Sequence, residues 1–249
     1  MIIVKSQREI EKIAAACRIV AEILLNLKSF IAADITTADI EAYVEDQIKK
    51  RKANPAFKGY RGYPASTCLS VNDQVVHGIP SRKVRLKNSD IISIDLGVLL
   101  EGFYGDGAAT FPVGAVGAEA LKLMSVTEEA LYVGIRKARA GNRVSDISSA
   151  IQHHAESNGF SVVRAFVGHG IGRSLHEDPQ VPNFGEPGKG PRLKEGMTLA
   201  IEPMVNAGCA EVNILDDGWT AVTADGRLSA HFEHTIAITK GDAAILTKI

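Results

Sequence analysis

Cysteine is scarce in this chain, which has three cysteines among 249 residues. Cys17, Cys68 and Cys209 are odd in number and far apart, whereas a disulfide framework needs pairs and a cysteine-based metal site needs close spacings such as CxxC. The scarcity therefore excludes a disulfide-stapled fold and a structural zinc site of that kind. We expect all three to be reduced thiols.

Long apolar runs and an excess of charge of one sign are also missing. No apolar stretch approaches the roughly 20 residues that cross a bilayer, and the opening segment MIIVKSQREIEK is too charged for a signal peptide. The formal net charge of -1 offers no general attraction to nucleic acid or anionic lipid. We therefore expect a cytoplasmic protein with no membrane association and no direct nucleic-acid specificity.

What the chain does contain is an internal near-repeat. The RLK segment at 85–87 leads into IISIDLGV with Asp95, and 107 residues later the RLK segment at 192–194 leads into MTLAIEPMV with Glu202. Two acids at matched places on apolar strands are costly to bury unless a positive charge lies between them. The repeat predicts one domain, 1–249, made of two related halves, with a divalent metal cluster between them.

Hydrophobic periodicity and capping residues predict the order of the elements. Ser6 and Glu9 have capping-box spacing before a long helical pattern. Further helices are expected from Thr36 or Thr37 to the basic run 49–52, around 121–135, and from a Ser145 cap to Gly159, and strands at 161–168, 197–205, 219–223 and 232–239. We infer an α+β domain in which a curved antiparallel sheet with internal pseudo-twofold symmetry is backed by helices.

The basic run Lys49–Lys52 has two interpretations. It could contact an anionic partner such as the ribosome, or it could be the solvated end of a helix, where the helix dipole favours positive charge. The second interpretation is preferred.

Four carboxylates and one imidazole lie in strand-like or glycine-flanked contexts. Such a ligand set suits one or two catalytic ions of the Mn, Fe, Co or Zn type better than it suits a structural zinc, which usually takes cysteine and histidine. Four negative charges match two divalent cations, and a two-metal centre supports hydrolysis. The five candidate ligands are Asp95, Asp106, His169, Glu202 and Glu233.

The remaining histidines divide by their surroundings. His153 and His154 fall on a helix and are expected at its surface or boundary. His234 points to the opposite face from Glu233, so we expect a structural role. His231 shares the Glu233 face, where it could support a ligand, but packing is the preferred interpretation.

His77 and His176 occur in turn-rich segments, VNDQVVHGIP and GRSLHEDPQVP, where loop residues beside a metal centre commonly orient substrate. The glycines around His169 lack both the GxGxxG spacing of dinucleotide-binding folds and the lysine of a P-loop, which excludes both types of nucleotide site.

Several ordered motifs closely resemble type I methionine aminopeptidases of the short bacterial form, which are "pita-bread" metallopeptidases. They are PAFKGYRGYPASTCLSVNDQVVHGIP, IDLGV, GDGAATF, VGHGIGRSLHEDPQVPN, GMTLAIEPM and DGWTAVTADGRLSAHFEHT, so the resemblance covers nearly the whole chain. It implies two divalent metal ions, with Asp106 and Glu233 bridging them, Asp95 completing one site, and His169 with Glu202 completing the other.

The resemblance also implies roles in catalysis and substrate binding. Glu202 matches the general base, and His77 and His176 match the substrate-contacting histidines. Two positions depart from the common bacterial pattern, Leu175 where an aromatic residue is frequent and Gly97 where a hydroxyl residue can occur. The implied methionine pocket consists of Phe57, Tyr60, Tyr63, Cys68, His77, Leu175 and Trp219.

The implied activity is removal of the initiator methionine from nascent polypeptides with a small second residue, by a protein that we expect to be a monomer. One alternative is a proline-directed aminopeptidase or prolidase of the same fold, although those enzymes usually carry a separate N-terminal domain. Another is a non-catalytic, ribosome-associated relative, which would be expected to lose ligands that are all present here.

Overall fold

A computed structural model describes residues 1–248. No helix within them is long and apolar enough to cross a membrane. The helices are α1 (Gln7–Phe30), α2 (Thr37–Lys50), the 3-10 turn η1 (Tyr60–Gly62), α3 (Ala118–Lys137) and α4 (Val144–Ser157). The strands are β1 (Asn54–Pro55), β2 (Thr67–Val71), β3 (Gln74–Val76), β4 (Ile91–Leu100), β5 (Phe103–Pro112), β6 (Ser161–Val162), β7 (Val167–Gly170), β8 (Glu177–Pro182), β9 (Thr198–Ile201), β10 (Met204–Asn206), β11 (Val212–Ile214), β12 (Ala221–Thr223), β13 (Ser229–His231), β14 (His234–Ala237) and β15 (Ala244–Ile245).

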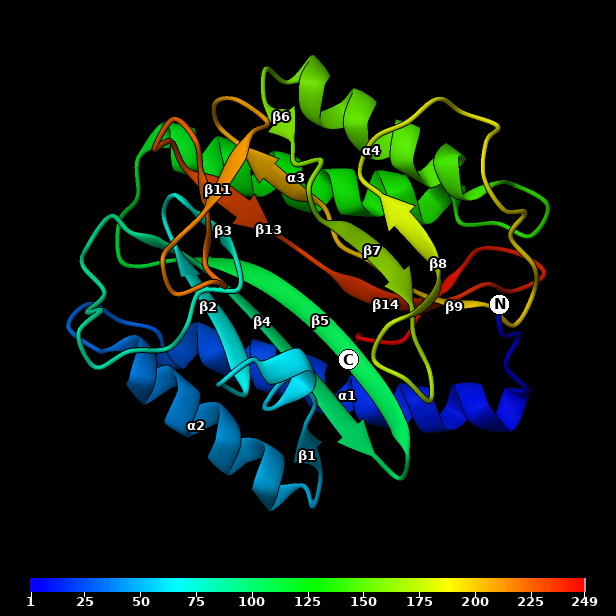
Figure 1. Cartoon of the computed structure of the whole chain (residues 1–249), viewed down its shortest axis with the longest axis horizontal. Helices are drawn as coiled ribbons and strands as arrows, with labels where there is room; N and C mark the ends of the chain where they lie inside the picture. Colours follow the sequence, from blue (N-terminus) through cyan, green and yellow to red (C-terminus); the bar gives the residue numbers. More distant parts are fainter. Residues whose placement is uncertain (249) are drawn as a thin grey trace.

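The strands pair antiparallel throughout the described chain and are covered by two pairs of helices. Figure 1 shows α1 and α2 on one side of the long β4–β5 hairpin and α3 and α4 on the other. The first half pairs β4 with β1, β2 and β5, and the second half has the order β15-β14-β9-β7-β8. The halves are joined where Glu233 donates its backbone N–H to Ala108 O at 2.9 Å. This is the α+β architecture expected from the sequence.

The internal repeat of the sequence is also present in three dimensions. Thr36 forms an isolated antiparallel bridge with Arg85, and Arg143 forms the corresponding bridge with Arg192. Each member of the second bridge follows its counterpart by the same 107 residues. The two halves therefore use the RLK segments in the same way, to tie the start of a helix to the entry of a central strand.

The helix starts follow the same repeat and correct one expectation. The Thr36 backbone N–H donates to Asp39 Oδ2 at 2.8 Å, and the Arg143 N–H donates to Asp146 Oδ2 at 2.7 Å. Because Asp146 satisfies the N–H of Arg143, the cap residue of α4 is Arg143, two residues before the expected Ser145 cap, and that expectation was wrong. Ser145 lies in the first turn, and its hydroxyl donates to a carbonyl of the loop after β8.

Two of the expected strands are each broken into two shorter ones. The segment 161–168 divides into β6 and β7, and 197–205 divides into β9 and β10. The second break falls at Glu202 and Pro203, because proline has no N–H with which to continue a ladder. After each break the chain changes sheets: β6 pairs with β10, whereas β7 pairs with β8 and β9. Glu202 therefore lies between two sheets rather than inside one strand.

The basic run at the end of α2 is partly neutralised by nearby acids. Lys50 Nζ lies 2.6 Å from Asp46 Oδ2, and Arg51 Nε lies 2.9 Å from Glu22 Oε2. These pairs fit the solvated helix end that the sequence favours. A ribosome contact through this run stays a prediction.

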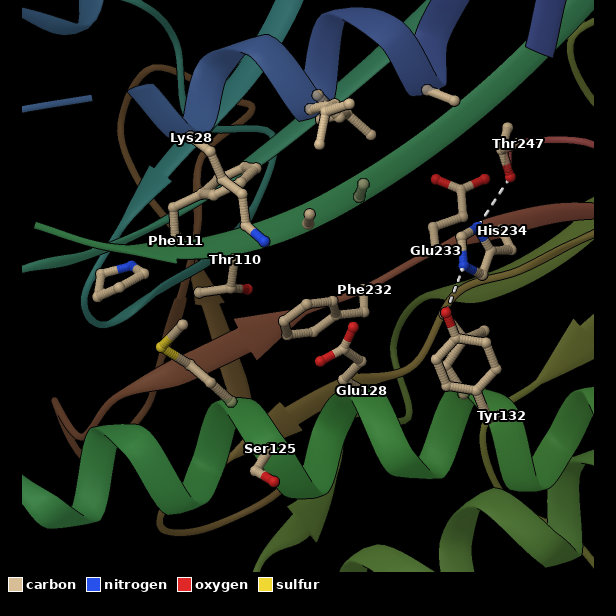
Figure 2. Close-up of a pocket in the computed structure, with 18 of the residues that line it drawn as sticks. Lys28, Thr110, Phe111, Ser125, Glu128, Tyr132, Phe232, Glu233, His234 and Thr247 are labelled. Atoms are coloured by element: carbon tan, nitrogen blue, oxygen red, sulfur yellow. Dashed lines mark hydrogen bonds between the residues drawn. The ribbon is translucent and has the colours of Figure 1, made fainter. Parts of the chain in front are cut away.

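A large groove lies on the outer face of the sheet, between α1, β5 and α3 (Figure 2), with a volume of about 850 Å³. His234 lies at one end of it, where Nε2 is 3.2 Å from the Tyr132 hydroxyl and Nδ1 is 2.9 Å from Thr247 Oγ1, as the dashed lines in Figure 2 show. His234 thus faces away from the acid cluster. Of the candidate ligands, Glu233 alone reaches the wall of this groove.

The position of α1 depends on a glycine in β5. A Cβ atom at Gly105 would lie 2.5 Å from the backbone nitrogen of Cys17, closer than real contacts allow. Because Gly105 precedes Asp106, this close approach packs α1 directly against the strand that carries a candidate ligand.

Gly105→Ala should lower the free energy of unfolding by about 1–3 kcal/mol, since α1 must move to admit the methyl group. Gly241→Ala is the matched control, because a Cβ there meets nothing within 4 Å, and it should change stability by less than about 0.5 kcal/mol. Urea unfolding of both variants measures the difference. Equal stability of the two variants would contradict close packing of α1 on β5.

Candidate metal centre and substrate pocket

Three of the five candidate ligands lie on central strands, and the other two lie directly after β9 and directly before β14. Asp95 lies on β4 and Asp106 on β5, whose pairing sets Gly97 opposite Asp106. His169 lies on β7. In the second half, β9 pairs with both β7 and β14, so that Glu202 at the end of β9 and Glu233 before β14 enter the same space as His169.

The ligand atoms of these residues are close together. One atom each of Asp106, His169 and Glu233 lie within 4.8 Å of one another. His169 Nε2 is 3.4 Å from Glu202 Oε1 and 3.9 Å from Asp106 Oδ2. Asp95 lines the same cavity. The structure therefore brings together all five residues that the sequence singled out as ligands.

No lysine or arginine compensates this negative charge among residues 1–248. None forms an ion pair with Asp95, Asp106, Glu202 or Glu233 in the described chain, and the buried Oδ1 of Asp95 and Oε1 of Glu233 lack hydrogen-bond partners. Burial raises the pKa of Asp95 to about 7. Burial first, and then the neighbouring carboxylates, raise the pKa values of Asp106, Glu202 and Glu233 well above their ordinary range.

The cluster has the charge and the donor atoms of a metal site. Unpartnered buried carboxylate oxygens are costly to ionise, and a divalent cation would satisfy both their charge and their lone pairs. The donors, four carboxylates and an imidazole, are those that Mn, Fe, Co and Zn accept. The residues therefore fit a centre of divalent metal ions.

The His169 ring is held in the neutral form and orientation of a metal ligand. Its Nδ1 lies 2.9 Å from its neighbour's carbonyl, Gly170 O, which leaves the lone pair of Nε2 directed at the carboxylates. Burial lowers its pKa to about 4, so the ring is neutral at pH 7. This is the protonation state that a metal-binding imidazole needs.

His231 lies directly behind Glu202. The side chain is buried, and its Nε2 is 3.8 Å from Glu202 Oε2 with no hydrogen-bond partner. Burial lowers the pKa of His231 to about 3, so the ring is neutral. Its position beside a candidate ligand favours the supporting role over packing alone.

One cavity of about 180 Å³ holds both the acid cluster and an aromatic, thiol-containing wall, and every residue expected in the substrate pocket lines it. The Tyr63 and Trp219 rings meet edge to face at 5.2 Å. The Tyr63 hydroxyl donates to Thr67 O at 3.0 Å, which holds this loop next to Cys68. Burial raises the pKa of Cys68, so its thiol stays protonated. The remaining lining residues from that expectation are Phe57, Tyr60, His77, Leu175 and His176.

The two loop histidines occupy different walls of this pocket. The His176 ring lies 4.2 Å from the His169 ring and stacks on Tyr60 at 5.1 Å, with Nδ1 2.9 Å from the Tyr60 hydroxyl. His77 contacts the aromatic side instead, 6.3 Å from Trp219 between ring centroids. His176 is thus next to the candidate metal ligands, and His77 is next to the apolar pocket.

Gly97 departs from the common pattern for a reason visible in the packing. A Cβ atom there would lie 2.6 Å from Phe57 Cε1 and 2.8 Å from the Cβ of Ala56. The missing side chain thus lets Phe57 pack against β4. Leu175, the other departure, is buried in the pocket wall.

A buried ion pair anchors the loop that carries Leu175 and His176. Lys5 Nζ donates to Glu177 Oε2, and the two side chains are 3% and 6% exposed. Glu177 Oε1 accepts the backbone N–H groups of Arg173 at 2.9 Å and Ser174 at 3.2 Å. No motif points to Lys5, because this pairing joins residues far apart in the chain.

Arg61 is a lining residue that no motif of the sequence singles out. It lies at the exposed mouth of the pocket in the YRGY segment, with positive φ at 50°. The local signal that could have indicated it is the pair of glycines at 59 and 62, which mark a tight turn between the pocket tyrosines.

Comparison with known proteins agrees with this site. The signature of metallopeptidase family M24 matches residues 11–240. A methionine aminopeptidase from Clostridium perfringens is 55% identical over 100% of both chains. The crystal structure of a methionine aminopeptidase from Thermotoga maritima, 49% identical, superposes with a TM-score of 0.98 over 100% of both chains.

The similarity to a prolidase is weaker. A prolidase from Pyrococcus horikoshii is 26% identical, with a TM-score of 0.80, and the match covers 99% of this chain but 63% of the prolidase. The full-length matches are with methionine aminopeptidases, and the prolidase has additional chain outside the matched part. The chain belongs to metallopeptidase family M24, within its methionine aminopeptidases of the short bacterial form.

Proposed function

We propose that this chain, acting as a single catalytic domain over 1–249, removes the N-terminal methionine from nascent proteins and peptides whose second residue is small. The observation that carries the proposal is the juxtaposition of a buried carboxylate–imidazole cluster with an aromatic pocket containing a thiol, within one cavity. Such a pocket suits an unbranched thioether, since sulfur and aromatic faces interact favourably.

Two divalent ions, of the Co, Mn, Fe(II) or Zn type, are the proposed cofactors. Asp95, Asp106, His169, Glu202 and Glu233 would hold them. When bound, such ions activate water and polarise a carbonyl.

Glu202 is the residue we assign to proton transfer. Burial, and then the charge of Asp95, raise the pKa of Glu202, which makes its carboxylate a stronger base for the proton of the attacking water, and His231 behind it limits where the carboxylate can move. The accepted proton is then delivered to the leaving amine.

His176 and His77 are assigned to the substrate. Burial lowers the pKa of His176 to about 3, so its ring is neutral. If Nδ1 accepts from the Tyr60 hydroxyl, the ring proton lies on Nε2, where it donates to the oxygen that gains charge during attack. Burial also lowers the pKa of His77, which orients the substrate as a neutral group from the pocket side.

Both alternatives have less support. A proline-directed enzyme is disfavoured by the partial coverage of the prolidase, and a non-catalytic relative is disfavoured by the complete set of five ligands around one cavity. A monomeric state stays a prediction.

Given Mn, Co or Fe(II), the protein should release methionine from Met-Ala-Ser or Met-Gly-Ser peptides. A lysine or glutamate as second residue should lower kcat/KM by about a hundredfold, because the family resemblance implies a tight space beyond the scissile bond. Peptides beginning with leucine or arginine, and Xaa-Pro peptides, provide the specificity controls. Equal turnover of these peptides would refute the proposed activity.

Metal removal should make stability depend on pH in a defined direction. The pKa of Asp95 is about 7 when folded, against 3.8 ordinarily, so its contribution is fully present below pH 3.8 and is lost as the pH rises through 7. Chelator-treated protein should therefore lose Tm between pH 5 and 8, and added Mn should raise Tm more at pH 8 than at pH 5. In Asp95→Asn, whose amide does not ionise, the slope without metal should be shallower. An unchanged slope in this variant would exclude Asp95 as its source.

Lys5→Met should lower the free energy of unfolding by about 3–5 kcal/mol, because it leaves the buried carboxylate of Glu177 unpaired. Adding Glu177→Gln should recover much of this loss and much of the turnover, since an amide oxygen still accepts from the loop N–H groups. Glu177→Ala should lose turnover even where the protein remains folded. Chemical unfolding and kcat on Met-Ala-Ser measure both effects. Additive losses in the double variant would show that the pair is not coupled.

A further inference from the structure

Arg61 supplies an unpaired positive charge at the mouth of the pocket. Of the described residues that line it, Arg61 alone is an arginine or lysine. Its side chain is exposed, and no carboxylate of residues 1–248 forms an ion pair with it. Its guanidinium carbon lies 5.4 Å from the centroid of the Tyr60 ring. The charge is therefore available to a ligand.

The backbone presents Arg61 at this position. Its φ of 50° and ψ of 21° are left-handed, a conformation that costs free energy for most residues other than glycine. The flanking Gly59 and Gly62 also have positive φ, and the turn is closed by the Gly59 N–H donating to Tyr63 O at 2.8 Å. Strain of this kind persists when the surrounding structure imposes it, and it gathers at functional sites.

The charges of the cavity are divided by depth. The carboxylates lie at the floor of the cavity, which the ammonium and first carbonyl of a substrate must reach. When ionised, their four negative charges are balanced by two divalent cations. Arg61 lies where the rest of the peptide leaves. When metal ions neutralise the floor, Arg61 is the charged lining residue that remains uncompensated at the mouth.

We propose that Arg61 is a specificity-determining residue that favours substrates with a carboxylate beyond their second residue. This inference rests on the proposed function, which sets the direction of the peptide. The carboxylate can belong to an acidic side chain or to the free C-terminus of a short peptide, and the same guanidinium contacts serve both.

The test compares amidated peptides that differ only in the third residue: Met-Ala-Asp-Ser, Met-Ala-Ser-Ser and Met-Ala-Lys-Ser. At low salt, kcat/KM should be about fivefold higher for aspartate than for lysine, in keeping with a partly exposed charge pair. Salt should reduce this ratio. Free-acid and amidated forms of Met-Ala-Ser measure the C-terminal carboxylate separately.

The variants assign the preference to one side chain. In Arg61→Gln the aspartate-to-lysine ratio should fall to about one, and Arg61→Lys should retain it. Arg18→Gln, which removes an exposed charge from α1 outside the pocket, should keep the ratio of the unaltered protein. A ratio that persists in Arg61→Gln, or one that falls equally in Arg18→Gln, would overturn the proposal.

A binding measurement separates this inference from the proposed activity. Trp219 is the only tryptophan of the chain and lines the pocket, so its fluorescence reports occupancy. The metal-loaded protein is titrated with reduced-bond analogues of the aspartate and lysine peptides, which have no scissile amide. We expect tighter binding of the aspartate analogue, lost in Arg61→Gln. If no methionyl peptide is cleaved, the proposed function fails, whereas equal binding of both analogues by the unaltered protein refutes the role of Arg61.

Discussion

Mutual repulsion among four buried carboxylates is the constraint on which the rest of this structure depends. Without compensation, burial and neighbouring charge push their pKa values upward, and two of their oxygens have no hydrogen-bond partner in the described chain. Within residues 1–248, no lysine or arginine forms an ion pair with any of the four. The protein instead keeps His169 and His231 neutral by burial, which preserves the negative potential for a cation from outside.

The duplicated architecture explains how such a costly arrangement is held in place. Each half contributes a central strand with an acid at the matched position, and each strand is tied to its helix by the same bridge. The two halves meet through hydrogen bonds between β5 and the segment around Glu233: the Glu233 N–H donates to Ala108 O at 2.9 Å, and Thr235 Oγ1 donates to Asp106 O at 2.8 Å. Because ladders on both sides fix the backbone, the carboxylates cannot relax apart without breaking secondary structure.

Local signals in the sequence indicated the helices and the acids and histidine that share the cavity, whereas the family resemblance indicated the residues of its apolar wall. Capping boxes and periodicity are short-range properties, and an acid within an apolar strand is conspicuous. The exceptions depend on distant partners. The strand breaks at 163–166 and at Pro203 arise because each segment changes sheets, and Arg143, whose N–H Asp146 accepts, holds the cap position expected of Ser145. Lys5 and Glu177 are far apart in the chain, so their pairing leaves no local pattern.

The site thus divides into a rigid part and an adjustable part. Candidate ligands lie on or directly beside strands, whereas the substrate-facing residues lie mainly on loops that a few side chains anchor. Glu177 holds the loop of His176, and Glu41 of α2 accepts the Ser66 N–H at 2.7 Å beside the loop of Tyr63. Loops anchored in this way can change their residues at the mouth without moving the carboxylates. Substrate preference and metal binding are therefore separable in this fold, because different backbone constraints govern them.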